Sequence, residues 1–165
     1  MRESLIYFNQ LIKKFEPYIE ALLKDPSFKE ELYKLGLAIQ KSNQAFGETG
    51  SFAFCKACAE SGIICCGKDL EWKLSKEELF INMCLFQLKG KDFKVNTSAE
   101  EACLFLGKKG CILELTPLFC RNFFCSKLSL YLGYEKLIYI QSTLEEEAIL
   151  SFRLCEYVKE KLKKR

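Results

Sequence analysis

The sequence contains no histidine. Its absence excludes Cys2His2 zinc fingers, Rieske clusters and three-histidine zinc sites. It also removes the side chain that most often serves as a catalytic acid or base. Neither G-x-G-x-x-G nor the P-loop pattern occurs, so the usual nucleotide-binding signatures are missing as well. The chain therefore offers no recognisable catalytic pattern.

A large excess of charge and long apolar runs are missing too. The formal net charge is only +3, which does not indicate a nucleic-acid partner, and the basic run KEKLKKR at the end is typical of a solvated helix tail. No stretch approaches the roughly 20 apolar residues needed to cross a bilayer. The charged N-terminal segment does not resemble a signal peptide. We therefore expect a cytoplasmic protein, with no membrane and no nucleic acid as partner, in which thiols stay reduced.

The length of 165 residues fits a single domain, 1–165, with a sizeable core. We predict a mainly α fold, with a helical shell around a small irregular cysteine-rich centre and a short β-hairpin. Residues 1–47 predict a helical hairpin, because apolar residues recur every three or four positions. Pro17 should kink or split its first helix, Asp25-Pro26 should begin the second, and Gly47 should close it.

The cysteine-bearing region is residues 51–125, and C-terminal helices are expected over 126–165. Residues 51–67 show little helical period, and LEWKL at 70–74 alternates like a short strand. Ser75 and Glu78 form a capping box that predicts a helix to about Leu88. GKKG between CLFL and CILEL predicts a hairpin. Ser142 and Glu145 offer a second capping box, before a C-terminal stripe that includes Phe152 and Cys155.

Ten cysteines are present, and eight of them form two dense groups. In a reducing compartment such clusters indicate a metal site rather than disulfides. Thiolates are soft ligands that select zinc or iron–sulfur clusters and not magnesium or calcium. The predicted metal ligands are Cys55, Cys58, Cys65, Cys66, Cys103, Cys111, Cys120 and Cys125.

Eight thiolates exceed the needs of one zinc ion, which takes four ligands. They therefore imply two sites or one polynuclear site. Cys65 and Cys66 are adjacent, and adjacent side chains in an extended chain point to opposite sides. They serve two different metals more easily than they chelate one. Arg121 and neighbouring lysines could compensate the negative charge of such a centre.

The two remaining cysteines have a simpler interpretation. Cys84 and Cys155 fall on apolar helix faces, and free cysteine commonly packs in cores as a small apolar side chain. A thioredoxin-like role for Cys55 and Cys58 would require a βαβ context, which the flanking sequence does not offer.

The cysteine pattern resembles the YkgJ-type cysteine-cluster family of zinc- or iron-chelating domains. The resemblance covers residues 55–125: a CxxC element ending in a double cysteine, then C-x-F-L, a turn, a further cysteine, and Pro-x-x-Cys-Arg before a last cysteine. This chain has six residues between the second cysteine and the double cysteine, where the family pattern usually has two, and Thr116 where an arginine usually precedes the proline. The matching positions are Cys55, Cys58, Cys65, Cys66, Cys103, Phe105, Leu106, Cys111, Pro117, Cys120, Arg121 and Cys125.

The resemblance implies metal chelation as the main function. Flagellin lysine N-methylases are similar in carrying such a cysteine pattern, and this implies an alternative: an iron–sulfur enzyme acting in redox chemistry or protein lysine methyl transfer. A third interpretation is a protein-interaction adaptor stapled by metal, with Phe119, Phe123 and Phe124 as a docking patch. We expect these rings instead to pack around the metal.

Overall fold

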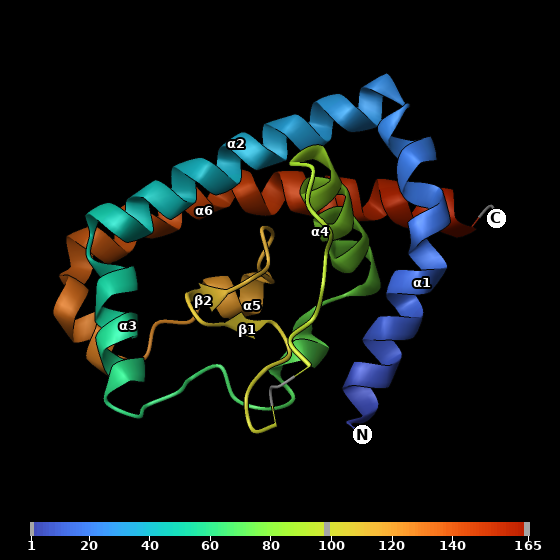
Figure 1. Ribbon diagram of the computed structural model, residues 1–165. Coiled ribbons are helices and arrows are strands. Elements are labelled where there is room, and N and C mark those ends of the chain that lie inside the picture. Colours follow the sequence, from blue (N-terminus) through green and yellow to red (C-terminus); the bar gives the residue numbers. More distant parts are fainter. Residues whose placement is uncertain (1, 98–99, 164–165) are drawn as a thin grey trace.

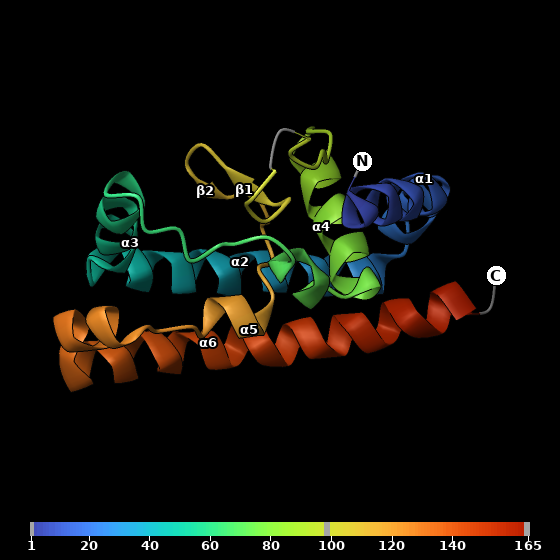
Figure 2. The same ribbon diagram turned by 90° about the horizontal axis from the view of Figure 1, so that it is seen from below.

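The protein is described by a computed structural model over residues 2–97 and 100–163. Two long helices, α2 (Pro26–Glu48) and α6 (Ser126–Lys163), lie side by side through most of its length (Figures 1 and 2). Their facing side chains form apolar clusters that include Phe28 with Leu154, and Phe46 with Leu144. The prediction of a mainly α fold is confirmed.

The first helix, α1 (Glu3–Leu23), forms the predicted hairpin with α2. The Asp25 side chain caps α2, accepting hydrogen bonds from the backbone N–H groups of Ser27 and Phe28 at 3.0 and 3.4 Å, and Pro26 follows at the first helical position. Pro17 does not split α1, which is one continuous helix with Pro17 inside it. Tertiary packing explains this, because Phe15 and Ile19 on either side of Pro17 are anchored in the core.

Helix α4 (Lys76–Leu88) is the most buried helix and lies between α1 and α6. It begins at the predicted capping box, in which the Glu78 N–H donates to Ser75 Oγ at 3.1 Å and the Ser75 N–H donates to the Glu78 carboxylate at 2.8 Å. Phe80 is fully buried and meets Phe15 edge to face. Cys84 is also fully buried, so its predicted core role is confirmed.

Three local predictions around the first cysteine group are wrong. Residues 51–60, expected to be irregular, form helix α3 (Ser51–Glu60), and α2 runs through Gly47 to Glu48. Gly50 makes this sharp junction, since its φ of 83° suits glycine and a Cβ there would come within 2.6 Å of the Tyr131 hydroxyl. The LEWKL segment, expected as a short strand, is a 3-10 helix, η1 (Leu70–Lys73), in which Glu71 is buried.

The hairpin prediction at GKKG is confirmed. Strands β1 (Leu106–Gly107) and β2 (Gly110–Cys111) pair antiparallel, with Leu106 opposite Cys111. A short helix, α5 (Leu118–Arg121), follows. Figure 1 shows the hairpin and α5 between α3 and α4, on the concave side formed with α2, and Figure 2 shows the same order.

The last helix does not begin at Ser142 as predicted. It is helical from Ser126 with one break at Gly133, where φ is 69° and ψ 175°. Ser142 lies inside it and donates to the Tyr139 carbonyl instead of capping. The predicted apolar stripe is only partly correct: Cys155 packs against the main core, but Phe152 is 68 % exposed. Among the helices described, none is both long and apolar enough to cross a bilayer.

Candidate metal centre

The first two predicted ligands lie on helix α3. Cys55 and Cys58 are three residues apart, so they face the same side of the helix. After α3 the chain turns back, and the Ile63 N–H donates to the Cys58 carbonyl at 2.9 Å. The C-x2-C spacing thus brings both thiols to one side, although by a helix and not by the isolated turn expected from the sequence.

Cys65 and Cys66 lie in the connection between α3 and η1, which has little regular structure. This connection is held to the second cysteine group by backbone hydrogen bonds. The Cys103 N–H donates to the Cys66 carbonyl at 2.9 Å, and Gly67 forms an isolated antiparallel bridge with Ala102. The two cysteine groups, separated by almost forty residues in sequence, therefore meet at Cys66 and Cys103.

Cys103 and Cys111 stand at the two sides of the β-hairpin. Each sulfur accepts a hydrogen bond from the backbone N–H two residues later, from Phe105 and from Leu113 respectively. Such bonds favour the charged thiolate and lower its pKa. Burial has the larger, opposite effect and raises the pKa of Cys103 to about 12. In the metal-free protein this sulfur is therefore a neutral thiol at pH 7.

Cys120 lies on α5, which is held in place by the next residue. The Arg121 guanidinium is buried, and it donates to Ser42 Oγ at 2.7 Å and to Asn43 Oδ1 at 2.6 Å. It also lies 3.4 Å from the Glu147 carboxylate and stacks over the Phe46 ring. Arg121 is thus a structural anchor between α2, α5 and α6, and its positive charge also opposes the burial that raises the pKa of Cys111.

Cys125 lies directly before α6. Its sulfur accepts a hydrogen bond from the Leu128 N–H at 3.4 Å, in the first turn of the helix. Its side chain belongs to the smaller apolar cluster, together with Phe54 of α3 and Phe124. Cys125 is therefore close to the helix that carries Cys55 and Cys58.

The pKa of the Cys55 thiol is affected by the sulfurs around it. Burial raises the pKa of Cys55, and the charges of Cys125, Cys58, Cys65 and Cys66 add to the effect in that order. These are charges on different segments, so α3, its following connection and the start of α6 converge here. Like charges close together disfavour ionisation, which a metal ion would reverse.

A second set of neighbours surrounds Cys120. Its pKa is raised to about 11, first by burial and then by the charges of Cys111 and Cys66. The pKa of Cys66 is likewise raised by burial first, then by Cys111 and Cys65. The structure thus brings the eight predicted sulfurs into one region, on α3, the following connection, the hairpin, α5 and the start of α6.

All ten cysteines are free thiols in the structure, so none is taken up in a disulfide. Over residues 2–97 and 100–163, however, no three cysteine, aspartate or glutamate side chains converge closely enough to hold a metal ion as they stand. The sulfurs are neighbours without forming a closed coordination shell. The donor set suits a soft metal, and a bound ion would require the side chains to close around it.

A buried carboxylate beside this region could not be assigned from the sequence. Glu71 is 1 % exposed and accepts hydrogen bonds through Oε1 from Arg2 at 2.6 Å and Ser4 at 2.5 Å. Arg2 also donates to the Ala102 carbonyl at 2.6 Å, next to Cys103. This network joins α1 and η1 to the second cysteine group.

The aromatic residues near Cys120 differ in burial. Phe124 stacks on Phe46 in the smaller apolar cluster. Phe119 and Phe123 are 56 % and 54 % exposed. The expectation that these two rings pack into a dry shell around the metal is therefore wrong. Glu114, the carboxylate nearest to the hairpin in sequence, pairs with Lys89 at 2.7 Å.

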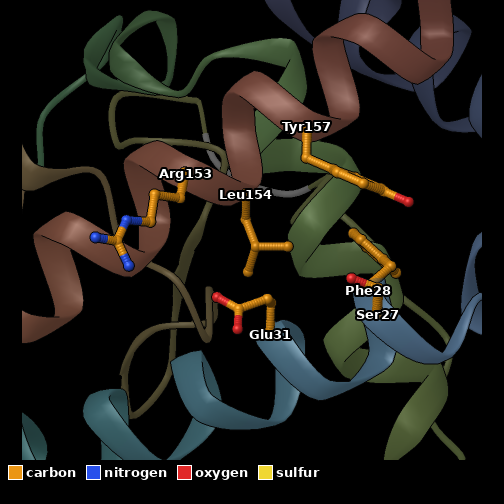
Figure 3. A pocket seen from close by; sticks show the side chains of 6 residues that line it. All are labelled: Ser27, Phe28, Glu31, Arg153, Leu154 and Tyr157. Atoms are coloured by element: carbon orange, nitrogen blue, oxygen red, sulfur yellow. The ribbon is translucent and has the colours of Figure 1, made fainter.

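Two cavities are lined by other residues, and the second of them is bounded by Thr116, whose hydroxyl lies 4.0 Å from the Cys111 sulfur. One, of about 150 Å³, is lined by Ser27, Phe28 and Glu31 of α2 and by Arg153, Leu154 and Tyr157 of α6 (Figure 3). The other, of about 290 Å³, lies between the start of α4, residues 115–118 and α6, and includes Glu147 and Cys155. Neither is lined by a predicted metal ligand.

No family model matches the chain, and no curated protein or solved structure shows significant similarity to it. The resemblance to the YkgJ-type family therefore rests on the cysteine spacing alone.

Proposed function

We propose that this is a cytoplasmic metal-binding protein whose eight cysteine thiolates hold zinc or an iron–sulfur cluster. The observation that carries the proposal is that eight reduced thiols, from two sequence groups, are neighbours in one region of the fold. Apolar packing does not explain such a cluster, because Cys55, Cys65, Cys66 and Cys111 are exposed. A soft metal ion does.

Local backbone geometry supports thiolate ligation. Cys103, Cys111 and Cys125 each accept a hydrogen bond from a backbone N–H. Hydrogen bonds of this kind to ligand atoms orient them and tune the metal. They also compensate part of the negative charge that four thiolates place around one ion.

The metal would stabilise the part of the fold that has the fewest regular elements. The only regular pairing in residues 61–69 and 100–117 is a hairpin with two residues in each strand and one isolated bridge, between Gly67 and Ala102. Binding free energy at a structural metal site contributes directly to folding. When bound, zinc would supply a rigid cross-link between these segments, whereas an iron–sulfur cluster would add electron transfer.

Metal and acid-labile sulfide analysis of anaerobically purified protein tests the proposal. We expect bound zinc, or iron with sulfide and visible absorption, in the wild type. Cys84→Ser serves as a control, since Cys84 is fully buried on α4 and is not a predicted ligand, so its loss should leave the metal content unchanged. Wild-type protein that contains no metal and takes up none when supplied with zinc or with iron and sulfide would refute the proposal.

Absorption also separates the alternatives. A brown protein that dithionite bleaches would favour the iron–sulfur enzyme. A colourless protein with stoichiometric zinc would favour the structural staple, with or without an adaptor role for the exposed Phe119 and Phe123 rings.

A further inference from the structure

We propose that the eight thiolates divide into two separate four-sulfur sites, and that the adjacent Cys65 and Cys66 belong to different ones. This inference rests on the proposed metal-binding function. The first site would consist of Cys55, Cys58, Cys65 and Cys125, and the second of Cys66, Cys103, Cys111 and Cys120.

The first set is brought together by α3 and the start of α6. Cys55 and Cys58 lie on one side of α3, and Cys125 shares an apolar cluster with Phe54 of the same helix. The backbone turn from Ile63 to the Cys58 carbonyl brings the following connection back towards α3. Cys125, Cys58 and Cys65 all raise the pKa of Cys55, as does the neighbouring Cys66.

The second set is brought together by the hairpin and its neighbours. A hydrogen bond joins the Cys103 and Cys66 backbones. In the hairpin, Cys111 is paired with Leu106, and Leu106 is only three residues along the chain from Cys103. Cys120 follows on α5, whose position Arg121 fixes against α2 and α6. Cys66 and Cys111 are both among the charges that act on Cys103 and on Cys120.

The vicinal pair lies where the two sets meet. Cys65 and Cys66 lie in a bend of this non-helical connection, and it is the Cys66 backbone that is held to Cys103. We infer that Cys65, one residue nearer to α3, turns towards that helix while Cys66 turns towards the hairpin. A single peptide bond then links the two sites. Each would take up one divalent ion and release the protons of the thiols that bind it.

Paired cysteine-to-serine substitutions in the full chain test this division. Cys58→Ser with Cys125→Ser removes two ligands from the first set, and Cys103→Ser with Cys120→Ser removes two from the second. Cys58→Ser with Cys120→Ser removes one from each. We expect zinc content to fall to about half of the wild-type value in the first two variants and nearly to zero in the third. Retention of half the zinc in the third variant, or complete loss in the first two, would overturn the division.

A measurement on the wild type avoids any effect of substitution on folding. Cadmium binds thiolates as zinc does, and NMR correlation between cadmium and the cysteine β-protons identifies the ligands of each ion. We expect two cadmium signals, each correlated with the four cysteines of one set. Cysteines that correlate with both cadmium ions would indicate a bridged, polynuclear site. That result, or a different grouping of the cysteines, would overturn the division while leaving metal binding intact. No bound cadmium at all would instead count against the proposed function.

Discussion

Replacing the buried Arg121 by methionine should destabilise the protein strongly. Its side chain is 8 % exposed and that of its ion-pair partner Glu147 is 5 % exposed. Methionine keeps the apolar length of the side chain and removes the charge and its hydrogen bonds. The Glu147 carboxylate would then stay buried, with a hydrogen bond from the Ser42 hydroxyl but without its counter-charge.

The expected magnitude follows from these contacts. Removing one partner of a buried ion pair costs about 3–5 kcal/mol, because the other charge is left uncompensated. Substituting both residues, Arg121→Met with Glu147→Gln, removes the isolated charge. We therefore expect the double variant to recover about 2 kcal/mol relative to Arg121→Met alone. Protein stabilities are about 5–15 kcal/mol, so the single variant loses a large fraction.

Urea unfolding at fixed metal concentration, followed by circular dichroism, measures these differences. The matched control is Lys41→Met, which breaks the exposed ion pair between Lys41 of α2 and Glu146 of α6. Exposed pairs contribute about 0–1 kcal/mol. A loss below about 1 kcal/mol for Arg121→Met, or a double variant less stable than the single, would refute the assigned role of Arg121.

Three further predictions test other parts of the account. Ser75→Ala should lower the free energy of unfolding by about 1 kcal/mol, because it removes the cap of α4; a urea series with Ser142→Ala, a serine inside α6, as control checks this, and equal effects would contradict it. Burial raises the pKa of Cys84 from 9.0 to about 12, so the folded state keeps a proton that the unfolded chain loses, and stability falls as pH rises from about 9 to 12. Cys84→Ala should therefore show a shallower alkaline decline in urea unfolding, by up to about 1.4 kcal/mol per pH unit, and an unchanged slope would contradict this. Removing metal with a chelator should increase hydrogen exchange in residues 61–69 and 100–117 and leave α4 protected; unchanged exchange in those segments would contradict a structural metal.

The long elements could be predicted from the sequence because local signals and packing agree there. Asp25-Pro26 and the Ser75 capping box mark helix starts, and both helices form. GKKG predicts the hairpin for the same reason, since two short apolar segments flank a turn. In these places propensity, capping and burial favour one structure.

The errors lie where tertiary contacts override local preference. LEWKL alternates like a strand, but Glu71 is drawn into the network with Arg2 and Ser4. Cysteines and aromatic residues concealed the helical period of α3. Ser142 has the sequence of a cap, yet α6 continues through it because Leu144 and neighbouring residues extend the apolar face.

The sulfur ligands of the candidate site could be predicted from the sequence, but the residues that hold the surrounding segments in place could not. Clustered cysteines indicated the sulfur donors directly. The partners of Arg121, namely Ser42, Asn43, Phe46 and Glu147, come from α2 and α6, far away in sequence. No local pattern marks such contacts, since they depend on how the long helices pack.

X-ray absorption spectroscopy of the metal in anaerobically purified protein tests the central claim most directly, because it reports the atoms bound to the ion. The account predicts a first shell of sulfur alone, at about 2.3 Å if the metal is zinc. A first shell dominated by oxygen or nitrogen would contradict it.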